Sequence, residues 1–229
     1  MVLSRHGIRC ALAASLTLGL VLPSASALAS EERGPGRVLE VLAFIEKTRR
    51  ETRYLHQTRI DPRRGIFRFD CSAMAGWVME RAVPHARRTV TGRPLARDFY
   101  HAIARLRPGQ RLGPWYRVPT VREARPGDVI AWIRPRWFPS SNSGHVAFVV
   151  SAPTENRGPV RGQLVRIADS TRLPHEADSR RSGKSGFGEG TMLLATDADG
   201  RPTGYGWHGS ISQPDWIIPT QIVIGRPLR

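Results

Sequence analysis

Apolar residues spaced by three and four positions predict helices in the first half of the chain. One such pattern runs over residues 38–50, after a glycine- and proline-containing loop expected at 34–36. A second begins at residue 71 and continues to about residue 79. A third follows Pro94 and ends before Pro108. Each pattern has a single apolar stripe, so we expect three amphipathic helices that pack on one core.

The pattern changes after about residue 110 to short apolar runs separated by Gly and Pro, which is typical of strands. Asp199-Gly200 fits a hairpin turn, and the basic, glycine-rich residues 180–190 are expected to form a mobile loop. Helices followed by strands predict an α+β domain with an antiparallel sheet. The expected strands cover residues 116–118, 128–133, 145–151, 164–169, 191–196, 204–207 and 221–224.

The first 29 residues have the pattern of an export signal. Arg5 and Arg9 precede an apolar run over residues 11–22, and small residues follow, so cleavage is expected after Ala27 or Ala29. The run is short for a membrane span, and no later segment is more apolar over that length. We therefore expect a periplasmic or secreted protein without a membrane span.

Removal of this signal leaves about 200 residues, which is the size of one domain, over residues 30–229. It also leaves Cys71 as the single cysteine, because Cys10 lies in the removed segment and far from any cleavage point. Structural cysteines of exported proteins come in pairs, so Cys71 is expected to be a free thiol. Many free cysteines are only small buried hydrophobes, and the surroundings of Cys71 decide between packing and chemistry.

Cys71 stands at the expected start of a helix, with Asp70 as the expected N-cap. The first turn of a helix favours an anion, and the thiolate is the nucleophilic form of cysteine. His145 opens one expected strand and Asp169 ends the next, so antiparallel pairing would bring them together. The pattern predicts Cys71 as a nucleophile, His145 as its general base and Asp169 as the carboxylate that orients the imidazole.

Three blocks of sequence resemble those of the NlpC/P60 cysteine peptidases. They are Asp-Cys-Ser at 70–72 before a helix, Pro-Gly-Asp and the apolar residues after it at 126–132, and Gly-His and its apolar run at 144–150. Their order and spacing match over residues 54–169, about half of the chain. The resemblance implies a papain-like α+β fold and cleavage of amide bonds in bacterial wall peptides, commonly between D-glutamate and a diamino acid.

The resemblance also implies roles for individual residues. Ala73 stands where the family usually has glycine, and Asp169 where it more often has histidine. The mechanism implied needs no cofactor and no metal, and a zinc site built from His175, Asp178 and His145 has no recognisable ligand spacing. By motif position the catalytic residues are Cys71, His145 and Asp169, and the substrate-binding residues are Tyr54 in the pocket and Asp70 and Ser72 near the substrate's free amine.

The chain is strongly basic, with a formal charge of +16 that falls to +14 when Arg5 and Arg9 are removed. This charge indicates attraction to a polyanion, or else only the base composition of a genome, because the arginines are scattered and no nucleic-acid motif appears. The expected partners are peptidoglycan or its peptide fragments and anionic wall polymers, and not nucleic acid. Two alternatives to hydrolysis stay open: an acyltransferase on the same scaffold, and a non-catalytic wall-binding module.

Overall fold

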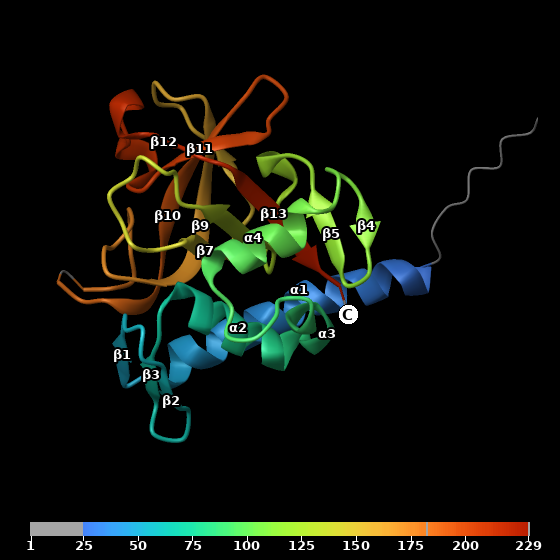
Figure 1. Ribbon diagram of the computed structural model, residues 1–229, viewed down its shortest axis with the longest axis vertical. Coiled ribbons are helices and arrows are strands. Elements are labelled where there is room, and N and C mark those ends of the chain that lie inside the picture. The colour runs from blue at the N-terminus through green and yellow to red at the C-terminus, as the bar shows by residue number, and fades with distance from the viewer. Residues whose placement is uncertain (1–24, 182, 229) are drawn as a thin grey trace, which may run out of the picture.

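The computed structural model describes residues 25–181 and 183–228 (Figure 1). Most of the predicted export signal, residues 1–24, lies outside the described residues, and Ala27 and Ala29 fall in the first helix. The helices are α1 (Ala25–Thr48), α2 (Cys71–Ala82), α3 (Pro84–Arg88) and α4 (Ala96–Ala104), with short 3-10 turns η1 (Val121–Glu123), η2 (Gly209–Ile211) and η3 (Pro214–Trp216).

The three predicted helices are confirmed, although the first begins much earlier than its apolar stripe. The Asp70 carboxylate caps α2 by accepting a hydrogen bond from the Ala73 amide at 2.8 Å, as the sequence predicts. The loop expected at 34–36 is wrong, because Pro35 lies inside α1. Tertiary packing accounts for this, since α1 lies against the C-terminal strand, with Gly34 close to the carbonyl of Pro227.

Ten strands form one large sheet in which every pairing is antiparallel, as expected for an α+β domain. Their order is β12-β11-β10-β9-β7-β6-β13-β5-β4, and β8 pairs with β9. The strands are β4 (Arg111–Leu112), β5 (Trp115–Val118), β6 (Val129–Ile133), β7 (Gly144–Val149), β8 (Thr154–Glu155), β9 (Gly162–Thr171), β10 (Gly186–Thr196), β11 (Pro202–Gly206), β12 (Ile218–Pro219) and β13 (Ile222–Pro227).

The sequence did not predict a second, three-stranded sheet of β1 (Glu51–Arg53), β2 (Arg59–Asp61) and β3 (Ile66–Arg68), in which β1 and β3 are parallel. The mobile loop expected over 180–190 is wrong for residues 186–190, because β10 begins at Gly186 and pairs with β9 from Gly186 to Ala195. Its glycines are needed for packing: a Cβ at Gly188 would overlap the Arg180 side chain, and one at Gly190 would meet His175 and Asp178.

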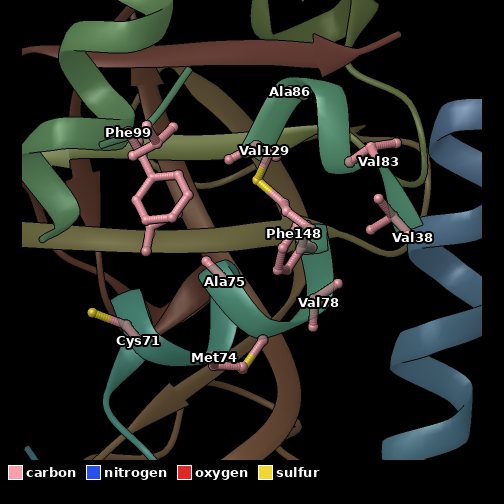
Figure 2. Packing of buried hydrophobic residues seen from close by; sticks show 14 of the residues in the cluster. Val38, Cys71, Met74, Ala75, Val78, Val83, Ala86, Phe99, Val129 and Phe148 are labelled. Carbon is pink, nitrogen blue, oxygen red and sulfur yellow. The ribbon is translucent and has the colours of Figure 1, made fainter. Parts of the chain in front are cut away.

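Both faces of the large sheet are buried, which explains why its central strands are apolar without alternation. Val129 and Phe148 point toward the helices and pack with Ala75 and Val78 of α2 in the cluster that Figure 2 shows. Trp132, also on β6, points into a second cluster on the opposite face. In the part of the chain that the structure describes, no helix is both long and apolar enough to cross a membrane.

Candidate active site

Cys71 is the first residue of α2 and lies at the edge of the helix-side core. In Figure 2 its sulfur points away from Met74 and Val78, which lie further along the same helix. The residue is 6% exposed and lines a cavity of about 690 Å³. Its backbone N–H belongs to the first helical turn, where amides have no partner within the helix. The backbone of Cys71 is therefore packed in the core, whereas its thiol faces a cavity that a substrate can enter, as a nucleophile requires.

The start of α2 is fixed to the large sheet by a buried hydrogen bond. The Ser170 hydroxyl on β9 donates to the carbonyl of Phe69 at 2.8 Å, two residues before Cys71. The Leu55 amide donates to the same carbonyl at 3.3 Å. Ser170 directly follows Asp169, so this contact ties the thiol-bearing helix to the strand that carries the carboxylate.

His145 and Asp169 come together because β7 and β9 pair antiparallel, as the sequence predicts. Val149 is opposite Ile167 in the register, so positions 145 and 169 fall on one face of the sheet. His145 Nε2 donates to Asp169 Oδ2 at 2.6 Å, since an ionised carboxylate can only accept. The second ring nitrogen, Nδ1, is then left for the thiol.

The pKa of His145 depends on Cys71 as well as on Asp169. Burial alone would lower the pKa of His145, but the charge of Cys71 and hydrogen bonds with Asp169 and Cys71 raise that pKa to about 10. The imidazole of His145 therefore carries a proton at neutral pH, and an imidazolium in this position can stabilise a neighbouring thiolate.

Asp169 is fully buried and has three cationic partners, two of which the sequence did not predict for this site. His175 Nε2 lies 3.0 Å from its Oδ2, and Arg180 contacts its Oδ1 and, at 2.8 Å, its backbone carbonyl. Burial alone would raise the pKa of Asp169, but His175, Arg180 and His145 lower it well below the usual range of a carboxyl. Asp169 is therefore ionised at neutral pH.

His175 is held between two acceptors. Its Nδ1 lies 3.1 Å from the carbonyl oxygen of Trp207, and its Nε2 faces Asp169. Arg180 also pairs with Asp178 at 2.6 Å. The cations His175 and Arg180 thus balance the carboxylates Asp169 and Asp178, and Asp169 acts on His145 mainly by holding its ring in place.

Aromatic rings surround the two histidines. The Trp132 ring lies 5.0 Å from His145, its partner in the β6–β7 register. Trp207 lies 5.4 Å from His145 and 4.2 Å from His175. These rings limit the access of water to the hydrogen bond between His145 and Asp169. Because the surroundings are then less polar than water, the hydrogen bond is stronger.

The residues predicted to bind substrate also gather near Cys71. Tyr54 lines the cavity beside Cys71, and burial followed by the charges of Cys71 and Asp70 raises its pKa, so it is a phenol that can donate. Asp70 accepts from Ser72 at 2.8 Å and from His56 at 3.2 Å, in addition to capping α2. The Asp70 carboxylate and the Ser72 hydroxyl therefore already have hydrogen-bond partners within the chain. Binding of the substrate's amine by these two residues stays a prediction.

Two adjoining cavities form a cleft across Cys71 and His145. The cavity of about 690 Å³ contains Cys71, and a second one of about 790 Å³ contains His145. Tyr54 and Gly144 line both. The second cavity is mainly aromatic and apolar, with contributions from Trp132, Phe138, Leu173, Tyr205, Trp207 and Ile218.

Local sequence patterns are weak for the residues that complete this site. His175 and Asp178 enter the sequence analysis as part of an unconvincing zinc set, and Arg180 falls in the basic, glycine-rich segment expected to be a mobile loop. Among the described residues no group of three His, Cys, Asp or Glu is arranged to hold a metal ion. Ser170 and Trp207 had no distinctive pattern, because their roles depend on contacts with distant segments.

Comparison with known proteins adds one relative. No model of a protein family matches the sequence, and no solved structure matches it. The chain is similar to an uncharacterized protein of Acanthamoeba polyphaga mimivirus, with 27% identity over 181 aligned positions that cover 69% of this chain and 76% of the relative. At this identity the relative assigns neither a family nor an activity, so the functional argument rests on the geometry of the cleft.

Proposed function

We propose that this protein is an exported cysteine hydrolase, an amidase or endopeptidase that cleaves amide bonds of peptidoglycan stem peptides. The observation that carries the proposal is that Cys71, at the start of α2, and His145, whose ring is held by the buried Asp169, line adjoining cavities of one cleft. A structural cysteine has no need of a histidine that is fixed on its other nitrogen. The cleft beside the thiol supplies room for a peptide.

In the first step the thiolate of Cys71 attacks the carbonyl carbon of the scissile amide. The backbone N–H of Cys71 donates to the oxygen on which negative charge develops. The C–N bond then breaks, and the imidazolium of His145 gives its proton to the leaving amine. The products are a thioester on Cys71 and a free amine.

In the second step water attacks the thioester, and the now neutral His145 accepts its proton. The C–S bond breaks, the acid leaves, and the thiolate–imidazolium pair is restored. If an amine replaced water here, the same site would catalyse transfer. No metal or organic cofactor takes part in this sequence of steps.

We also propose a papain-like fold of the NlpC/P60 type. It is supported by the placement of the thiol at the start of a helix that packs on the sheet, and of the histidine and carboxylate on neighbouring strands of that sheet. The motif resemblance over residues 54–169 supports it independently. The export signal and the wall substrate belong to the same proposal.

The test is incubation of the purified protein with isolated stem peptides, followed by mass spectrometry. We expect two fragments whose masses add up to substrate plus one water, and no fragments with Cys71→Ala. A molar excess of glycine amide separates hydrolysis from transfer, because transfer adds the acceptor to the acyl fragment. Equal cleavage by the wild type and Cys71→Ala would refute the proposal.

A further inference from the structure

The cavity that contains Cys71 has an excess of positive charge close to the thiol. Arg97, Arg134 and Arg136 line it, whereas Asp70 is its single lining carboxylate. Asp70 is already engaged with Ser72, His56 and the first turn of α2. We refer to the three arginines as the arginine lobe.

In the described part of the chain, the one ion pair of the arginine lobe is the long, exposed contact of Arg97 with Asp98. Arg134 donates to the carbonyl oxygens of Asn142 and Phe138, at 2.8 and 2.7 Å, and so retains its charge without a carboxylate. Arg97 comes no closer than 4.0 Å to Asp98, and 58% of its side chain is exposed. Arg136 is exposed, with no ion pair to any described residue. The lobe is therefore available to an anion from solution.

The position of the arginine lobe, and not an excess of arginine alone, sets it apart. Another cavity, of about 920 Å³ and on a different face of α2, also contains arginines but not Cys71. Arg68 pairs there with Glu51 at 2.6 Å, but Arg87 and Arg93 donate to backbone carbonyls, so positive charge is in excess in that cavity as well. The arginines that share a cavity with the thiol are those of the arginine lobe.

We propose that the arginine lobe binds a carboxylate or phosphate group of the acyl substrate and makes the cleft selective for acidic substrates. This inference rests on the proposed function, because it places the reacting carbonyl at Cys71. The planar fork of arginine matches both oxyanions with two parallel hydrogen bonds. The aromatic cavity beside His145 would then receive the less polar part of the substrate.

The test compares alkylation of Cys71 by iodoacetate and by iodoacetamide, which differ in charge and little in size. The variant Arg97→Gln/Arg136→Gln keeps Arg134, which holds the neighbouring loop. The matched control Arg122→Gln/Arg161→Gln removes two exposed arginines from another cavity, which does not contain Cys71. Wild type, lobe variant and control are measured at low salt and at about 1 M salt, where the Debye length is about 3 Å.

We expect the ratio of the iodoacetate rate to the iodoacetamide rate to fall about tenfold in the lobe variant at low salt, in line with electrostatic steering, and to be unchanged in the control. High salt should reduce the difference. Equal ratios in all three proteins, or an equal fall in variant and control, would overturn the proposal. A protein that cleaves no stem peptide but shows the expected ratios would lose the hydrolase assignment and keep the anion site.

The source of the anion is identified by protection of Cys71 from iodoacetamide. Protection by alanyl-glutamic acid α-amide but not by alanyl-glutamine α-amide, which has no carboxylate, assigns the lobe to carboxylates, and protection by inorganic phosphate alone assigns it to phosphates. Either protection should be lost in the lobe variant and kept in the control. Protection that persists in the lobe variant would contradict the assignment to these arginines.

Discussion

His145 Nε2 donates to Oδ2 of Asp169 at 2.6 Å, and this contact determines which ring nitrogen is left for Cys71. The carboxylate is neutralised on its other sides by His175 and Arg180. Asp169 therefore fixes the orientation of the ring, whereas the charge of Cys71 contributes more to its protonation than the charge of Asp169 does.

Replacing Cys71 with alanine should lower the pKa of His145. Both upward effects of Cys71, its charge and its hydrogen bond, disappear, while burial continues to lower the pKa. The measurement is an NMR titration of the His145 ring in Cys71→Ala, compared with the wild type. A pKa that stayed near 10 in the variant would show that Asp169, and not Cys71, sustains the imidazolium.

Hydrolysis should decline as the pH rises through about 10, because His145 then loses the proton that the leaving amine needs. The same rise should not reduce alkylation of Cys71 by iodoacetamide, since that reaction needs only the thiolate. Both pH profiles can be measured on one preparation. A parallel decline of the two rates would indicate alkaline unfolding and not the titration of His145.

His175→Gln should raise the pKa of His145 above its wild-type value. The substitution removes a buried cation that repels the imidazolium and partly neutralises Asp169, whereas glutamine can still donate a hydrogen bond. NMR titration of His145 distinguishes this positioning role from simple loss of packing. An unchanged pKa of His145 in a folded variant would show that His175 does not influence His145.

Arg180→Met should lower the free energy of unfolding by about 3–5 kcal/mol, because it leaves Asp169 and Asp178 buried with fewer partners. Urea denaturation measures the loss, and Arg161→Met, at an exposed position, should change stability by less than about 0.5 kcal/mol.

The same substitution should shift acid unfolding to higher pH. The lowered pKa of Asp169 contributes stability above the unfolded carboxyl value of roughly 3.9, and this contribution is lost as the pH falls toward the folded value. Without Arg180 the pKa of Asp169 in the folded protein rises, so ionisation of Asp169 contributes less to the free energy of unfolding. An unchanged acid midpoint would show that Arg180 has little effect on Asp169.

Gly144→Ala should disturb the position of His145 and reduce hydrolysis at least about tenfold, since small misplacements of reacting groups are costly. Gly144 has a φ of 143°, and a Cβ there would overlap the carbonyl oxygen of Trp132. The control is Gly36→Ala in α1, where a Cβ meets no atom within 4 Å. It should stabilise the helix by up to about 1 kcal/mol and leave hydrolysis unchanged.

Local patterns in the sequence were sufficient for much of the fold. The spacing of apolar residues predicted α2 and α4, and the Asp70 cap fixed where α2 begins. Seven strands of the large sheet were predicted, because short apolar runs between Gly and Pro carry their own signal. The start of α1 and the first half of β10, residues 186–190, were not predicted, since they depend on packing against β13 and on pairing with β9.

The sequence by itself determined that one thiol would stand at the start of a helix. It also determined that one histidine would open a strand and that one carboxylate would close the next strand. These are properties of a few adjacent residues, such as Asp70 beside Cys71. Only the tertiary structure decided that His175 and Arg180 hold Asp169 and that Ser170 ties the thiol helix to the sheet. Such contacts join segments up to about a hundred residues apart, and no local preference encodes them.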